Sequence, residues 1–189
     1  MFLSVSSQNP DLKQILRKEN RIMKTRSLVV SALIAGAYLV LTILLAPISY
    51  GPVQFRVSEA LTLLPLIFPQ AVPGLFVGCL LANIFGGYGA VDIIFGSLAT
   101  LIAALLTRCI GTYVKGKTLK LLLGALPPVI VNAVIIGAML SFVGTNRIDT
   151  ALFILYGGQI FLGQAGVLYI LGIPLVIGLR KIKRLNIKT

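Results

Sequence analysis

Apolar residues fill long stretches of this chain, and polar residues gather between them. Four runs with at most one charged residue cover residues 27–45, 91–107, 121–143 and 151–179. A helix that crosses a bilayer needs about 20 mainly apolar residues, with a usable range of about 17–25. Each of these runs therefore predicts one transmembrane helix, and the last one is long enough to tilt or to extend past the membrane.

The stretch from residue 57 to residue 91 is too long for one helix and divides into two short ones. Three prolines, Pro65, Pro69 and Pro73, follow one another at four-residue spacing. Prolines at this spacing cannot continue one regular helix. Two short helices joined at a proline-rich turn bring the predicted total to six.

Composition and charge support this count. The chain has 189 residues, of which 57% are hydrophobic and 12% charged, with a net charge of +12. Six crossings with both termini in the cytoplasm place all but two of the 17 basic residues inside, the exceptions being Arg56 and Arg147. Five crossings would divide the basic clusters between the two sides, against the positive-inside rule. We therefore predict an all-α, multi-pass protein of a prokaryotic cell membrane, and we exclude nucleic acid as a partner.

The chain divides into a cytoplasmic extension over 1–22, a six-helix membrane domain over 23–180 and a basic cytoplasmic tail over 181–189. Apolar residues among the charges of the extension suit an amphipathic surface helix. In the alternative, Met23 begins the native chain and the extension is disordered. The extension lacks the apolar core of a signal peptide.

Catalytic and cofactor chemistry finds little support. The sequence has no histidine, and its two cysteines lie in apolar runs. Residues 111–118 match the phosphate-loop pattern G-x-x-x-x-G-K-[ST], but they follow a membrane helix, whereas that loop works between a strand and a helix. We expect this match to be coincidental. The chain is predicted to be no enzyme and to hold no metal or cofactor.

Acidic residues at the ends of two predicted spans point to an outward-facing pocket. Glu59 and Asp92 lie just inside the second and fourth spans, where an ionisable group is costly and marks a functional site by default. Arg56 stands three residues before Glu59, close enough to orient or neutralise it. Amides and phenols at similar depth or nearer the midplane extend this set: Asn83, Asn132, Tyr156, Gln159 and Gln164.

Simpler roles for the same residues stay open. Arg56 and Glu59 can form an interfacial ion pair, and Asp92 can cap a helix. The amides can join neighbouring helices by hydrogen bonds, and small residues spaced four apart in the first, third and fourth spans allow close helix packing.

Three segments, Phe55–Pro65, Pro73–Asn83 and Asp92–Thr100, resemble the QueT family. Members of that family are substrate-binding S-components of energy-coupling factor (ECF) transporters, assigned to the uptake of queuosine precursors. The resemblance covers about residues 23–180. It implies a six-helix binder that associates with a membrane coupling protein and two cytoplasmic ATPases. The loaded S-component topples in the membrane, and the ATP is used by its partners only.

The resemblance also implies roles for individual residues. S-components contact the coupling protein through an Ala-x-x-x-Ala pattern in the first helix, which corresponds here to the group Ala32, Ala35 and Gly36, with Gly in place of the second Ala. In the pocket, Glu59 would accept the two N–H groups of a deazaguanine such as prequeuosine or queuine. Asn83 or Gln159 would donate to the carbonyl of the ligand, and Asp92 would pair with a cationic aminomethyl group. Tyr88 or Tyr156 would stack on the ring. Arg56 and Asn132 complete the predicted substrate-binding residues. Alternatives are an S-component for another vitamin or nucleobase, and a self-sufficient secondary carrier.

Overall fold

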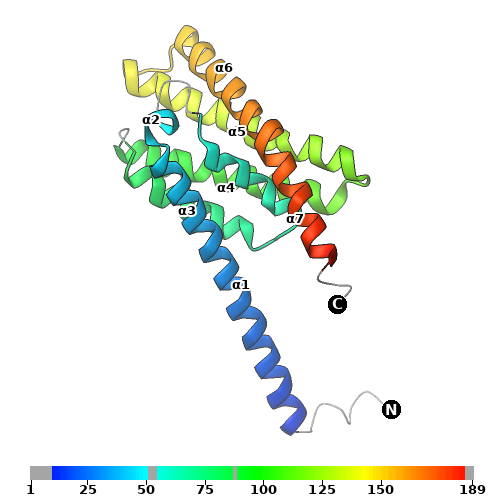
Figure 1. The fold of residues 1–189 in the computed structure, drawn as a ribbon. Helices are drawn as coiled ribbons and strands as arrows, with labels where there is room; N and C mark the ends of the chain where they lie inside the picture. The colour runs from blue at the N-terminus through cyan, green and yellow to red at the C-terminus, as the bar shows by residue number, and fades with distance from the viewer. Residues whose placement is uncertain (1–9, 51–54, 87–88, 186–189) are drawn as a thin grey trace, which may run out of the picture.

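The computed structural model describes residues 10–50, 55–86 and 89–185, and every regular element in these ranges is helical. The prediction of an all-α fold is confirmed. Figure 1 shows the elements in chain order, which are α1 (Pro10–Leu44), α2 (Ala46–Ser49), η1 (Val57–Leu66), α3 (Ala71–Ile84), α4 (Gly89–Tyr113), α5 (Lys117–Thr145), α6 (Thr150–Val167), η2 (Leu168–Gly172) and α7 (Ile173–Leu185). The element η1 is a 3₁₀ helix, and η2 is one π-helical turn.

Four segments of the described chain are long and apolar enough to cross a membrane. They are Arg21–Leu44, Gly89–Tyr113, Lys117–Thr145 and Thr150–Ile182. They coincide with the four apolar runs of the sequence, and the last of them joins α6, η2 and α7. The two shorter apolar helices, η1 and α3, occupy the stretch that the prolines divide. Six crossings and cytoplasmic termini stay predictions.

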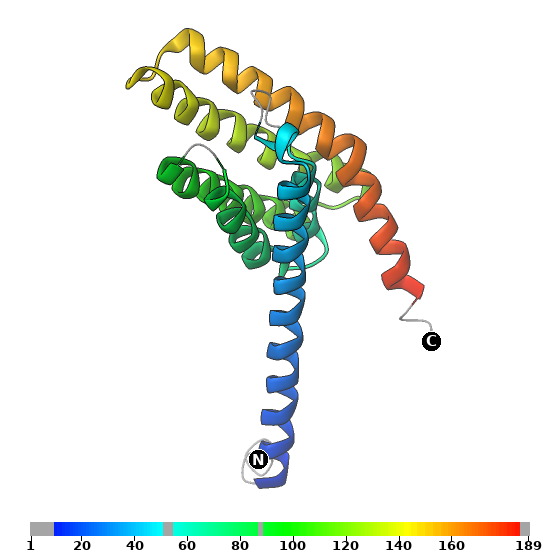
Figure 2. The ribbon, with the colours of Figure 1, turned by 60° about the vertical axis from the view of Figure 1, so that its left-hand side comes forward.

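Helix α1 runs without a break from Pro10 to Leu44. The described part of the extension, from Pro10 on, therefore belongs to the same helix as the first span. Proline is favoured at the first position of a helix, and neither proline nor glycine follows it before Gly36. Figures 1 and 2 show the N-terminal half of α1 projecting from the bundle.

The short helix η1 occupies the centre of the bundle. Eight of its ten residues are buried, and it contacts α1, α3, α4, α5, α6, η2 and α7. Small residues allow this close approach, because a Cβ atom on Gly172 would lie 2.9 Å from the side chain of Leu63. Pro65 lies inside η1 and removes one backbone donor from it. The centre of the fold is thus an irregular helix that carries Glu59.

Helices α1 and α3 pack through small residues. A Cβ atom on Gly74 would lie 2.6 Å from the carbonyl oxygen of Ser31, and one on Gly78 would lie 2.8 Å from that of Ala35. Ala35 is therefore buried against α3. By contrast, Ala32 is exposed, and no other part of the described structure comes within 4 Å of a Cβ placed on Gly36, apart from the neighbouring backbone of α1. The three small residues of the first span divide between an internal contact and an open face.

Candidate functional site

A buried carboxylate, Glu59, lies in the first turn of η1 and accepts hydrogen bonds from three other helices. The hydroxyl of Tyr38 on α1 donates to Glu59 Oε1. The amide Nε2 of Gln164 on α6 donates to Oε2 at 2.8 Å, and Nδ2 of Asn132 on α5 donates to the same oxygen at 3.4 Å. Glu59 is only 2% exposed. We call these four residues the Glu59 cluster.

The backbone around Glu59 is fixed by short side chains. Thr62 Oγ1 donates to the carbonyl oxygen of Glu59 at 2.6 Å, and the hydroxyls of Thr42 and Ser58 lie 2.7 Å apart in a second contact between α1 and η1. A carboxylate in the first turn of a helix is stabilised by the backbone N–H groups there. The position of Glu59 is therefore held independently of its side-chain partners.

A small cavity borders the carboxylate. It is lined by Arg56, Glu59, Gly96, Thr100, Asn132, Ile136, Ile160 and Gln164, and its volume is about 10 Å³. This is space for roughly one water molecule. The lining combines polar side chains with two isoleucines. The side chains close on one another in this conformation.

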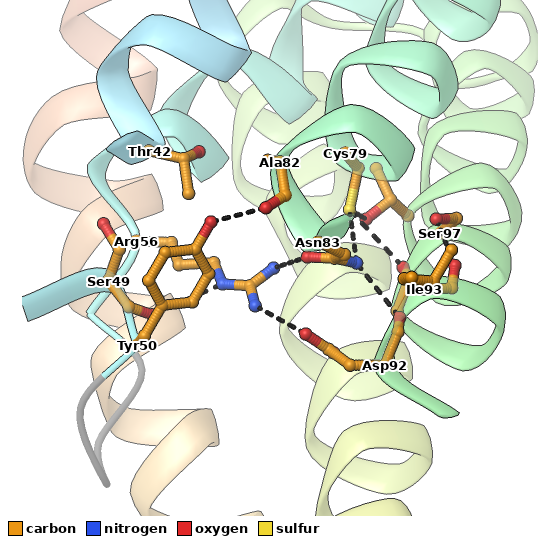
Figure 3. Close-up of polar contacts among 12 residues, drawn as sticks. Thr42, Ser49, Tyr50, Arg56, Cys79, Ala82, Asn83, Asp92, Ile93 and Ser97 are labelled. Atoms are coloured by element: carbon orange, nitrogen blue, oxygen red, sulfur yellow. Dashed lines mark hydrogen bonds and ion pairs between the residues drawn. The ribbon is translucent and has the colours of Figure 1, made fainter. Parts of the chain in front are cut away.

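Arg56 is the centre of a second set of polar contacts, next to the Glu59 cluster. Figure 3 shows the residues of this second set. Arg56 donates through Nη1 to Asn83 Oδ1 at 2.9 Å, its Nη2 lies 3.5 Å from Asp92 Oδ2 in an ion pair, and its Nε donates to the carbonyl of Ser49 at 3.4 Å. The guanidinium lies 5.4 Å from the ring centroid of Tyr50, a favourable cation–π distance. We call these five residues the Arg56 clasp.

Arg56 pairs with Asp92, and none of the described residues forms an ion pair with Glu59. The simpler alternative, an ion pair between Arg56 and Glu59, is thus not present among the described residues. The i, i+3 spacing brings side chains together only within a helix. Arg56 precedes η1 in an extended conformation, with φ −85° and ψ 102°, so its head group turns toward α3 and α4.

Tyr50 connects the clasp to the end of α3. Its hydroxyl donates to the carbonyl oxygen of Ala82 at 2.6 Å. Burial raises the pKa of the Tyr50 phenol, and the nearby Arg56 offsets only part of that rise. The phenol therefore keeps its proton and remains a donor.

Asn83 has little capacity left for a ligand. Its Oδ1 accepts from Arg56, while its Nδ2 donates to the carbonyl oxygen of Asp92 at 3.1 Å and contacts Cys79 Sγ at 3.5 Å. Gly96 makes room for this arrangement, because a Cβ atom there would lie 2.5 Å from Asn83 Nδ2 and 2.9 Å from Asp92 Oδ1. Asp92 Oδ1 is buried and has no hydrogen-bond partner among the residues that the structure describes. Gly96 belongs to both the cavity and the surroundings of the clasp.

The predicted residues thus separate into different surroundings. Glu59, Asn132 and Arg56 line the cavity, whereas Asn83 and Asp92 are not among its lining residues. Gln159 is half-buried, and its Oε1 has no hydrogen-bond partner within the described part of the chain. Tyr156 packs on the apolar cluster around Ile136 and Ile160. Tyr88 lies outside the described residues.

Sequence reasoning assigned no role to Tyr38 or Thr100. Tyr38 is fully buried near the C-terminal end of α1, surrounded in sequence by small and apolar residues. The one available signal was the phenol itself, because a buried tyrosine hydroxyl in an apolar span needs a hydrogen-bond partner. Thr100 lies one turn after Gly96 on α4 and borders the cavity.

Several helices long and apolar enough to cross a membrane enclose a buried polar site, as in a multi-pass membrane protein. The model of the family described as QueT transporter matches residues 28–181. This chain belongs to the QueT transporter family, and it is a multi-pass protein of the cell membrane.

One curated relative is the queuosine precursor transporter QueT of Lactococcus lactis subsp. cremoris, 40% identical over 81 residues. The matched segment covers 42% of this chain and 47% of the relative, so the chain spans about half the length of that relative. No solved structure matches the chain.

Proposed function

We propose that this protein is the S-component of an ECF importer and that it captures a deazaguanine precursor of queuosine outside the cell. The observation that carries the proposal is the Glu59 carboxylate, buried beside a cavity and held by neutral donors only. Family membership supports the transport class, and the name of the Lactococcus relative supports the ligand class.

The Glu59 carboxylate is an acceptor suited to the edge of a guanine-like ring. Such a ring presents two adjacent N–H donors, which one carboxylate accepts together. In the structure, two amide N–H donors, from Asn132 and Gln164, occupy one oxygen of Glu59. A ligand that replaces these donors exchanges hydrogen bonds of the same kind, so little is lost when the amides turn away.

Ligand entry requires the side chains to move, because a cavity of about 10 Å³ is far too small for a bicyclic ring. Gln164 and Asn132 are the residues whose displacement frees the carboxylate. The side chains of Ile136 and Ile160 then cover the faces of the ring, and Arg56 or Thr100 donates to its carbonyl oxygen. The freed amides serve as further donors.

Asn83 and Asp92 act on the ligand through Arg56 in this proposal. Asp92 already pairs with Arg56, so a cationic aminomethyl group on the ligand has to compete with the guanidinium for the carboxylate. The aminomethyl group therefore contributes less to affinity than the guanine-like edge. We assign Asn83 and Asp92 as positioning residues.

Transport would follow from association with a membrane coupling protein and two cytoplasmic ATPases. The chain would cross the membrane six times with both termini in the cytoplasm, and it would use no ATP itself. The small, exposed residues Ala32 and Gly36 on α1 would allow a helix of the coupling protein to approach closely. Ala35 supports this face from inside, through its contact with α3.

Calorimetry on the purified full chain in detergent tests the ligand. The panel contains aminomethyl-deazaguanine, cyano-deazaguanine, queuine, guanine, riboflavin and thiamine. We expect tight one-to-one binding of the deazaguanines and much weaker binding of guanine. Tight binding of riboflavin or thiamine alone would retain the S-component and discard the ligand.

Proteoliposomes test the mechanism. The chain alone should bind ligand without accumulating it, and uptake should require the coupling protein, the ATPases and ATP. Uptake by the chain alone, driven by an ion gradient, would show a secondary carrier.

A further inference from the structure

A cleft at the opposite end of the helices from Glu59 collects positive charge. It lies between the turn that joins α4 to α5 and the end of α7, and its volume is about 520 Å³. The residues lining it are Thr112, Val114, Lys115, Gly116, Lys117, Lys120 and Arg180. Four of these seven residues are cationic and none is acidic.

The cations of the cleft have no carboxylate partner among the residues that the structure describes. Lys120 is engaged by a backbone group, since its Nζ donates to the carbonyl oxygen of Gly111 at 2.7 Å. That contact holds the turn in place while Lys115, Lys117 and Arg180 keep their charge unneutralised. Helix α5 begins here after Gly116 (φ 93°) and has no side-chain cap. Its first N–H groups add to the positive potential of the cleft.

Exposed apolar side chains adjoin the lining residues of the cleft in the sequence. Tyr113 at the end of α4 is 80% exposed, Leu119 in the first turns of α5 is 51% exposed, and Ile182 on α7 is 57% exposed. All three lie within a few residues of the cationic lining. A free phosphate ion gains nothing from contact with apolar side chains. A molecule with an anionic head and an apolar tail matches both the cationic lining and the apolar side chains.

We propose that this cleft binds the phosphate group of an anionic phospholipid, with its acyl chains against the exposed side chains of α5 and α7. Basic pockets between membrane helices at the cytoplasmic surface are suited to lipid head groups. The role follows from the charge and shape of the cleft and is independent of the ligand at Glu59. It also accounts for the glycine and lysines at 111–118 without a nucleotide site.

Native mass spectrometry of the full chain in neutral detergent tests the proposal, with dioctanoyl phosphatidylglycerol as the probe. Dioctanoyl phosphatidylcholine, inorganic phosphate and ATP are titrated in parallel. We expect phosphatidylglycerol to bind best. The double variant Lys115→Gln/Arg180→Gln should bind it about 25-fold more weakly, about fivefold for each cation.

The matched control is Lys24→Gln/Arg26→Gln, which removes the same two charges from exposed positions on α1. It should bind phosphatidylglycerol within twofold of the unmodified chain. An equal loss of phosphatidylglycerol binding in the control would show that overall charge causes the effect, and it would overturn the site. Equal binding of inorganic phosphate would make it a free-phosphate site, and preferential binding of ATP would make it a nucleotide site. Either result would overturn the lipid assignment.

Discussion

The Glu59 cluster and the Arg56 clasp lie side by side, yet each handles a buried charge differently. Glu59 is surrounded by neutral donors and borders a cavity. Arg56 is neutralised by Asp92 and is further bonded to Asn83 and to a backbone carbonyl. One group can exchange its partners, whereas the other is already paired with an opposite charge.

The free energies of these two arrangements differ. Exchanging one neutral hydrogen-bond donor for another changes the free energy little, because each bond contributes only about 0.5–1.5 kcal/mol net. Breaking a buried ion pair by removing one partner costs about 3–5 kcal/mol, because a charge is left uncompensated. In the proposed function, the Glu59 cluster is therefore the group that exchanges partners with the ligand, and the Arg56 clasp is the group that stays rigid.

The substitution Arg56→Met should have the largest effect, because it leaves Asp92 buried without its cation. We expect the protein in detergent to unfold about 10 °C lower, which corresponds to about 3–5 kcal/mol. Thermal unfolding followed by circular dichroism measures this. The double variant Arg56→Met/Asp92→Leu should recover much of the loss, since neither charge remains. Equal melting temperatures for the single and double variants would show that the ion pair is not the source of the stability.

The substitution Glu59→Gln should weaken deazaguanine binding about 100-fold. The ligand loses a charged acceptor, and hydrogen bonds to charged groups contribute about 1.5–3 kcal/mol each. Calorimetry with cyano-deazaguanine measures this, because that ligand carries no cationic substituent. Asp92→Asn removes the other buried carboxylate and should act mainly on the melting temperature. If Asp92→Asn weakened binding as much as Glu59→Gln, the division between the two groups would fail.

The substitution Tyr38→Phe should weaken the same binding about tenfold, or about 1.4 kcal/mol, because Glu59 loses the donor that orients its Oε1. The matched control is Thr42→Val, which removes another buried hydroxyl from α1. Thr42 bonds to Ser58 and does not line the cavity, so this change should lower the melting temperature and leave affinity intact. Equal affinities for the two variants would show that Tyr38 has no part in ligand binding.

The substitution Gly96→Ala probes the boundary between the two groups and should have the smallest effect. The added methyl group has to push Asn83 and Asp92 aside, at a cost of about 1 kcal/mol. We expect a melting temperature about 3 °C lower. Gly158→Ala on α6 is the control, because no atom lies within 4 Å of a Cβ placed there. A loss of stability in Gly158→Ala but not in Gly96→Ala would contradict the close packing at Gly96.

The long helices could be predicted from the sequence, because runs of about 20 apolar residues have one stable form in a bilayer. The proline-rich break was also predictable, since Pro65, Pro69 and Pro73 exclude a continuous helix. The 3₁₀ form of η1 was not, because it depends on packing against seven other elements. Periodicity within one segment carries no information about such contacts.

The candidate site was predictable in its residue types and unpredictable in its pairing. Glu59 and Asp92 stood out because carboxylates are rare in membrane spans. The partner of Arg56 depended on the extended backbone before η1, which spacing along the chain does not reveal. Tyr38 could not be predicted, because a tyrosine within an apolar run looks like an ordinary packing residue until its neighbours in space are known.

The 3₁₀ geometry of η1 has a consequence for how a short segment reaches through the protein. Each residue of a 3₁₀ helix advances about 2.0 Å, compared with 1.5 Å in an α-helix. Ten residues therefore extend roughly 20 Å in place of about 15 Å, or two thirds of a hydrocarbon layer about 30 Å thick. The tighter winding lets a segment with too few residues for an ordinary span carry Glu59 at one end and Leu66 well into the other half of the bundle.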